Sequence, residues 1–112
     1  MTYKTYIFII LTLGSFFSVI AQSERKMTRN GNKSYETGNF IDAEINYKKA
    51  LEIARQIGNK KNEGVNLGNL GNIHQQLGQY EQAIAYYDQS ITISESIDHE
   101  QYRGIFLGNK GD

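Results

Sequence analysis

The sequence repeats itself at a fixed offset of 40 positions. Segments 38–58 and 78–98 carry one pattern, in which Gly38, Phe40, Ala43, Tyr47, Ala50, Ile53 and Ile57 recur as Gly78, Tyr80, Ala83, Tyr87, Ser90, Ile93 and Ile97. The intervening sequence also repeats, because Gly64, Leu67, Gly68, Asn69 and Gly71 recur as Gly104, Leu107, Gly108, Asn109 and Gly111. A fixed period of this length predicts a solenoid of stacked supersecondary units. Solenoid proteins usually function by presenting a surface and not by catalysing a reaction.

Turn signals divide the chain every 20 residues, at Gly38–Asn39, Gly58–Asn59, Gly78–Gln79 and Asp98–His99. Between them, apolar residues recur with helical spacing and no proline interrupts the pattern. The spacing therefore predicts helices over about 24–37, 40–57, 60–77, 80–97 and from 100 to the end of the chain.

These positions resemble the tetratricopeptide repeat in its long, 40-residue form. The resemblance rests on Leu67, Leu70, Gly71, Gly78, Tyr80, Ala83 and Tyr87 in the second copy and on Gly31, Gly38, Phe40, Ala43, Tyr47 and Ala50 in the first. It implies an all-α fold, a right-handed α-solenoid of antiparallel helix pairs with about two and a half repeats. We expect a repeat domain over 22–112, with repeats at about 24–58 and 60–98 and a partial one at 100–112.

Small residues in the repeat predict close helix packing. Gly71 and Ala83 are expected where two antiparallel helices cross, and Tyr80 and Tyr87 are expected to fill the space between repeats. Gly64, Gly68 and Gly71 lie in one predicted helix, where each glycine costs roughly 1 kcal/mol relative to alanine. Close backbone approach is the expected compensation.

Amide side chains suggest a binding groove. Asn69 and Asn72 share a helix face that leaves out Leu67 and Leu70, and an amide both donates and accepts hydrogen bonds, which suits it to a peptide backbone. The full candidate set is Arg29, Asn32, Asn69, Asn72, Gln75, Gln76 and Asn109.

The Leu-Gly-Asn stretch is similar to that of Pins-type and kinesin-light-chain-type adaptors, which implies that Asn32, Asn69, Asn72 and Asn109 bind a protein or peptide ligand. The alternative is a merely solvated polar face. A carboxylate clamp is incomplete, because Thr28 and Ile105 stand where that pattern has lysine.

The first 21 residues have the pattern of a signal peptide. Lys4 precedes an uncharged, apolar run over 7–21, which ends in Val19-Ile20-Ala21. Cleavage after Ala21 predicts an exported, periplasmic or secreted protein. The alternative is an uncleaved segment that keeps the chain at the membrane, but a spanning helix needs roughly 20 apolar residues.

Composition argues against several functional classes. Removing residues 1–21 leaves 11 basic and 12 acidic residues, a formal charge of −1, which gives nucleic acid no basic surface. The chain has no cysteine, and His74 and His99 are not in metal-ligand spacing with carboxylates. His74 is interpreted as a packing residue. We therefore expect neither an enzyme nor a bound metal or cofactor.

Two functions remain after these exclusions. The first is an exported scaffold that binds a protein or peptide in its concave groove. The alternative is the N-terminal sensory part of a bacterial membrane signalling protein, a histidine kinase or transcriptional regulator, whose output domain lies outside this sequence.

Overall fold

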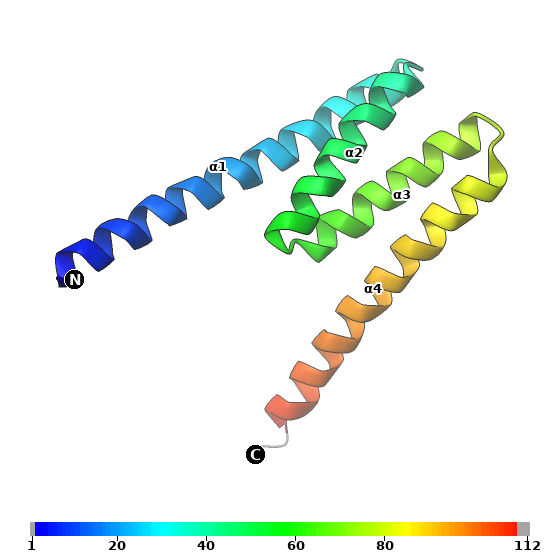
Figure 1. Cartoon of the computed structure of the whole chain (residues 1–112). Coiled ribbons are helices and arrows are strands. Elements are labelled where there is room, and N and C mark those ends of the chain that lie inside the picture. Colours follow the sequence, from blue (N-terminus) through cyan, green and yellow to red (C-terminus); the bar gives the residue numbers. More distant parts are fainter. Residues whose placement is uncertain (1, 110–112) are drawn as a thin grey trace.

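The protein is built from four consecutive α-helices. The computed structural model describes residues 2–109, with side chains through Gln101, and its helices are α1 (Tyr3–Glu36), α2 (Phe40–Ile57), α3 (Lys60–Gln76) and α4 (Tyr80–Asn109) (Figure 1). Helix α1 packs on α2, α2 on α3, and α3 on α4. The all-α prediction of antiparallel helix pairs is confirmed.

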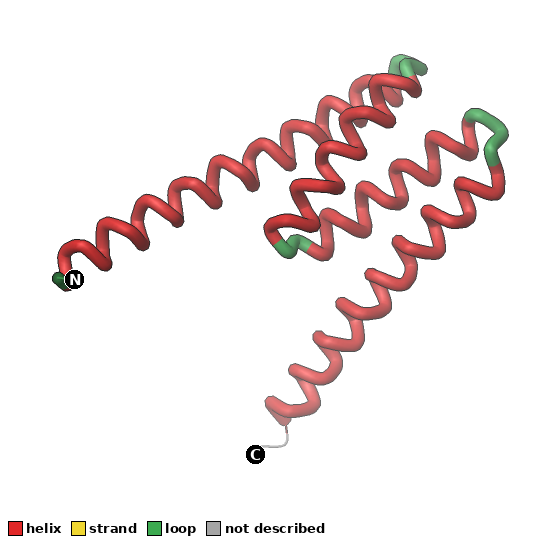
Figure 2. Tube along the Cα trace, in the orientation of Figure 1, coloured by secondary structure: helices red, strands yellow, loops and turns green. Residues whose placement is uncertain are grey.

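Glycine ends three of the helices. Gly38, Gly58 and Gly78 have φ values of 79°, 72° and 72°, in the left-handed region that glycine adopts without a steric penalty. At each turn, paired backbone hydrogen bonds close a Schellman motif, as where Asn39 N–H donates to the Ser34 carbonyl over 2.8 Å. Three short connections between the helices result, shown as green segments in Figure 2.

The expected turn at Asp98–His99 is wrong, because α4 continues without a break to Asn109. The matching turn 40 residues earlier, at Gly58 and Asn59, explains the difference. Gly58 supplies the left-handed residue, and the Asn59 side chain accepts a hydrogen bond from Asn62 N–H to begin the next helix. Asp98 and His99 provide no glycine, so nothing in the local sequence forces the helix to end there.

The core lies where α2 and α3 meet and is built from repeat residues. The fully or nearly fully buried apolar side chains there include Ala43, Tyr47, Leu51, Leu67, Leu70 and Ile73. Ala50 and Ala83, two small positions of the pattern, are also buried. The repeat pattern therefore identified much of the core correctly.

Tyr80 does not fill the space between repeats, contrary to expectation, because it is 64% exposed. Its counterpart Phe40 is partly buried and packs edge-on against Tyr35, with ring centroids 5.5 Å apart. The residue 40 positions after Tyr35 is Gln75. The second repeat thus lacks the aromatic partner that holds Phe40 in the first.

Helix α1 begins at Tyr3, so the expected start near residue 24 is wrong. The apolar run continues directly into the repeat helix, since neither glycine turn nor proline separates them. Its N-terminal part projects away from α2 (Figure 1), and residues 2–19 are exposed. By length and composition α1 is the one described helix apolar enough to cross a membrane, a test that N-terminal signal sequences also pass.

Candidate functional site

Three of the predicted asparagines meet in one cavity between the two repeats. The cavity has a volume of about 120 Å³ and is lined by Asn32, Tyr35 and Glu36 from α1, Tyr47 from α2, and Asn69 and Asn72 from α3. Asn32 and Asn72 are exposed, and Asn69 is half-buried. Residues about 40 positions apart in sequence therefore contribute amides to a common surface, which we call the amide groove.

Tyrosine hydroxyls orient two of these amides. The Tyr47 hydroxyl donates to Asn32 Oδ1 over 2.7 Å. In the second repeat, the Tyr87 hydroxyl lies 2.5 Å from Asn72 Oδ1 and 2.8 Å from Gln75 Oε1, so two acceptors share its proton. With the Asn32 and Asn72 oxygens engaged by tyrosine, the Nδ2 groups are left to donate.

Each of these tyrosines lies over a glycine of the preceding helix. A Cβ added to Gly31 would come within 2.6 Å of the Tyr47 ring, and one added to Gly71 would come equally close to the Tyr87 ring. The close partner of Gly71 is therefore the Tyr87 ring, where Ala83 was expected. By contrast, a Cβ at Gly64 or Gly68 would meet its nearest neighbour at an ordinary 3.5 Å, so close approach does not explain those two glycines.

Burial of both tyrosines favours the neutral, donating form of their hydroxyls. It raises the pKa of Tyr47 to about 12, and the nearby Tyr35 and Glu36 groups add to this effect. Burial, with a further contribution from Tyr35, also raises the pKa of Tyr87 above its ordinary value. Both hydroxyls are neutral donors at neutral pH, as an ordinary tyrosine is, and the raised pKa values extend this state to more alkaline pH.

A second cavity lies between α3 and α4 in the second repeat. It has a volume of about 500 Å³ and its lining includes Gly64, Gly68, Asn69, Asn72, Ser90 and Ile97 from α3 and α4. In the first repeat, the residues matching Gly64 and Gly68 are Glu24 and Thr28, and these contact α3. Asn69 and Asn72 thus border both this open face and the amide groove.

The other predicted site residues do not line the cavity of the amide groove. Gln75 accepts from Tyr87 beside Asn72, while Gln76 is exposed at the end of α3. Arg29 lines a different cavity, with Glu24 and Asn66. Asn109 is the last residue of α4, and its side chain lies outside the described residues.

Sequence analysis missed a buried polar cluster that joins α1 to α3. Glu24 is 1% exposed and Asn66 is fully buried. The Glu24 carboxylate accepts from Asn62 Nδ2 over 2.7 Å, from the Thr28 hydroxyl over 3.1 Å and from Asn66 Nδ2 over 3.4 Å. The i, i+4 spacing of Asn62 and Asn66 places both amides on one face of α3 and could have indicated the cluster. The repeat comparison did not reveal Glu24, because its counterpart 40 residues later is Gly64.

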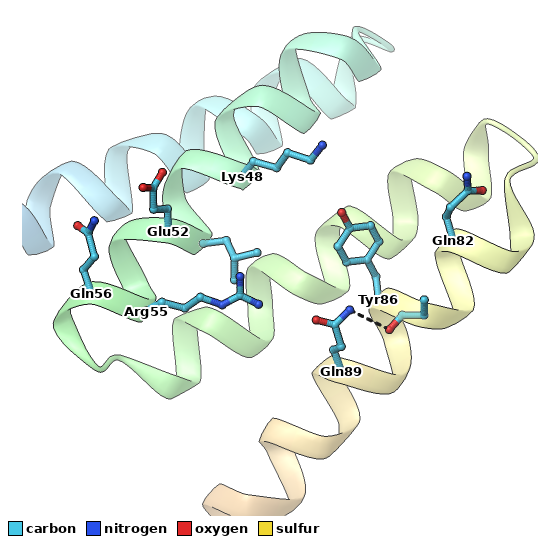
Figure 3. Close-up of a pocket in the computed structure, with 9 residues that line it drawn as sticks. Lys48, Glu52, Arg55, Gln56, Gln82, Tyr86 and Gln89 are labelled. Carbon is cyan, nitrogen blue, oxygen red and sulfur yellow. Dashed lines mark hydrogen bonds between the residues drawn. The ribbon is translucent and has the colours of Figure 1, made fainter.

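A further cavity, of about 580 Å³, separates α2 from α4. Its lining includes Lys48, Glu52 and Arg55 on α2 and Gln82, Tyr86 and Gln89 on α4 (Figure 3). The two cations are already paired, Lys48 with Glu44 at 2.9 Å and Arg55 with Glu63 at 3.2 Å. The hydrogen bond to Glu44 also raises the pKa of Lys48.

His74 is held by packing and by one hydrogen bond. Its ring stacks on Tyr86, with centroids 5.3 Å apart, and Nδ1 lies 2.6 Å from Gln79 Oε1. On the other side of the ring, Nε2 lies 3.5 Å from Glu44 Oε1. The interpretation of His74 as a packing residue agrees with this environment, and within the described part of the chain no three His, Cys, Asp or Glu side chains group as metal ligands.

Comparison with known proteins gives one positive result. A family model described as tetratricopeptide repeat matches residues 27–96, which is well over half of the chain. Searches of curated proteins and of solved structures found no match. The matched span contains both glycine–tyrosine pairs and all three asparagines of the amide groove. On this evidence the chain belongs to the tetratricopeptide-repeat family.

Proposed function

We propose that the protein is an exported, non-enzymatic scaffold that binds a protein or peptide partner in the amide groove. Tetratricopeptide repeats suggest a scaffold for protein–protein interaction, which supports the general class. The observation that carries the specific proposal is the convergence of Asn32, Asn69 and Asn72 on one cavity. Two of their amides are already oriented by tyrosine hydroxyls, so less ordering is needed when a ligand binds.

The groove amides provide donors for the carbonyl groups of a bound peptide. Each neutral hydrogen bond contributes roughly 0.5 to 1.5 kcal/mol net. Two such bonds, from Asn69 and Asn72, correspond to roughly tenfold in affinity. Hydrogen bonds of this kind recognise the peptide backbone more than the side chains of the ligand.

The double variant Asn69→Ala/Asn72→Ala tests this proposal. A photo-crosslinking residue at position 69 identifies the contacted peptide, with the same residue at exposed Lys49 as a background control. The synthetic peptide is then titrated by calorimetry, and we expect the double variant to bind it about tenfold more weakly. Circular dichroism should record unchanged helicity.

A matched control is Lys48→Ala/Lys49→Ala, which alters exposed residues of α2 outside the amide groove. This control should retain wild-type affinity. Equal affinity of wild type and the asparagine double variant would mean that the groove amides are only solvated and that the partner binds elsewhere.

The export part of the proposal is supported by the lack of packing around the N-terminal segment. Every side chain from Thr2 to Val19 is exposed, so removal of residues 1–21 sacrifices little of the repeat packing. We expect mass spectrometry of the exported protein to find Gln22 at its N-terminus. An intact Met1 in the membrane fraction would instead indicate an uncleaved anchor.

A further inference from the structure

The amide groove contains one ionisable carboxylate in a setting of aromatic and amide groups. We propose that Glu36, together with Tyr35 and Tyr47, forms a subsite for a lysine or arginine side chain of the bound peptide, which we call the Glu36 subsite. This inference rests on the proposed function, because it assigns the ligand chemistry of the same groove.

The negative charge of Glu36 is not balanced within the cavity. Glu36 is the one charged residue in the lining, and within residues 2–101 no cation lies in salt-bridge range of its carboxylate. The neighbouring cations of α1 line other cavities, Arg29 the one beside Glu24 and Lys33 one formed with Asn46. A ligand cation would provide the missing countercharge.

The carboxylate acts on the groove itself. Glu36 is among the groups that raise the pKa of the Tyr47 hydroxyl, so its electrostatic field reaches another side chain of the cavity lining. Tyr35 contributes to the same shift and is half-buried at the cavity wall. A cation placed there would lie beside a carboxylate and two tyrosine side chains, and tyrosine rings attract cations electrostatically.

The size of the cavity fits a side-chain end. Its volume of about 120 Å³ is well below the roughly 300 to 1,000 Å³ typical of small-molecule sites. An ammonium or guanidinium group with its adjacent methylenes is on this scale. Asn69 also lines the cavity, and its amide has an oxygen that can accept a hydrogen bond.

The subsite is confined to the first repeat. The residues 40 positions after Tyr35 and Glu36 are Gln75 and Gln76, so the second repeat has neither the ring nor the charge. Gln75 is instead engaged with the Tyr87 hydroxyl. This asymmetry would fix the direction in which a peptide with one basic residue lies along the groove.

Blocked pentapeptides Ac-Ala-Ala-X-Ala-Ala-NH2, with X as Arg, Lys, Gln or Glu, test the proposal by NMR titration of the purified full chain. We expect the Arg and Lys peptides to shift the ring signals of Tyr35 and Tyr47 and to bind about fivefold more tightly than the Gln peptide, and the Glu peptide to bind most weakly. Glu36→Gln, which copies the residue at position 76, should abolish this preference. Glu81→Gln removes an equal charge from an exposed site on α4 and should preserve it.

The possible outcomes distinguish a failure of the Glu36 subsite from a failure of peptide binding in the amide groove. If all four peptides shift the Asn69 and Asn72 amide signals equally, the groove binds peptide and the Glu36 subsite is wrong. If Glu36→Gln retains the preference for arginine, the subsite is also wrong. If no peptide shifts any groove signal, both the subsite and the proposed groove function are contradicted. Because Glu36 is exposed, its variant should fold, which circular dichroism verifies.

Discussion

Replacing Gly31 with alanine will lower the melting temperature of the protein by about 6 °C, although alanine is the better helix former. The new Cβ would lie 2.6 Å from two ring atoms of Tyr47, which is 2% exposed and cannot move aside easily. Overpacking of this kind costs typically 1 to 3 kcal/mol, partly offset by about 1 kcal/mol of helix propensity. In a domain of this size, each kcal/mol shifts the melting temperature by roughly 4 to 8 °C.

Gly68→Ala is the matched control, and its expected effect has the opposite sign. Its Cβ would meet the Ser90 hydroxyl oxygen at 3.5 Å, an ordinary contact, so the variant should gain up to about 1 kcal/mol of helix propensity. Thermal melts followed by circular dichroism measure both variants. If Gly31→Ala melts at or above the wild-type temperature, the Tyr47 ring does not require the glycine.

Replacing Glu24 with alanine will destabilise the protein by about 3 kcal/mol. The carboxylate accepts hydrogen bonds from Asn62, Thr28 and Asn66, and hydrogen bonds to charged groups contribute about 1.5 to 3 kcal/mol each. Asn66 is fully buried, so the loss of the acceptor removes one of the partners of its side-chain amide where water does not reach. The result would be a weaker connection between α1 and α3.

Chemical denaturation measures this loss, and two further variants control it. Glu24→Gln keeps one acceptor oxygen but brings a donor toward the asparagine donors, so its stability should fall between those of wild type and Glu24→Ala. Glu52→Ala removes an exposed glutamate of α2 and should remain within about 0.5 kcal/mol of wild type. A Glu24→Ala variant as stable as Glu52→Ala would show that the buried cluster contributes nothing to folding.

The position of Glu24 gives this cluster a wider role. It lies three residues after Ala21, the predicted cleavage site. If the segment is removed there, Glu24 holds the first turn of the remaining α1 against α3. The cluster would then protect the new N-terminus from fraying, which backbone hydrogen exchange can follow.

The repeat pattern predicted the fold well where glycine and the apolar spacing acted locally. Gly38, Gly58 and Gly78 ended helices as expected, since a positive φ favours glycine whatever surrounds it. Spacing likewise identified Leu67 and Leu70 as core residues. The same reasoning failed at Asp98–His99, where a weaker turn signal without glycine did not stop α4.

The groove could be predicted only in part. Sequence offsets placed Asn32 and Asn72 in matching positions, but they could not indicate that tyrosine hydroxyls occupy the oxygens of both amides. Glu36 did not stand out either, because its role depends on Tyr35 and Tyr47 lining the same cavity. These contacts form between side chains of different helices, so the periodicity of a single helix does not reveal them.

The sequence by itself determined that the chain forms helices in pairs with a 40-residue period, because helical propensity, glycine turns and apolar spacing act over short distances along the chain. Tertiary structure alone decided which small residues are essential. Gly31 and Gly71 each face a tyrosine ring, whereas Gly64 and Gly68 have ordinary clearance, although all four are helical glycines of the 40-residue repeat pattern. The same holds for Glu24, which is buried because α3 brings two asparagines to it. The physical reason is that steric contact and desolvation depend on what the neighbouring helix places at each position.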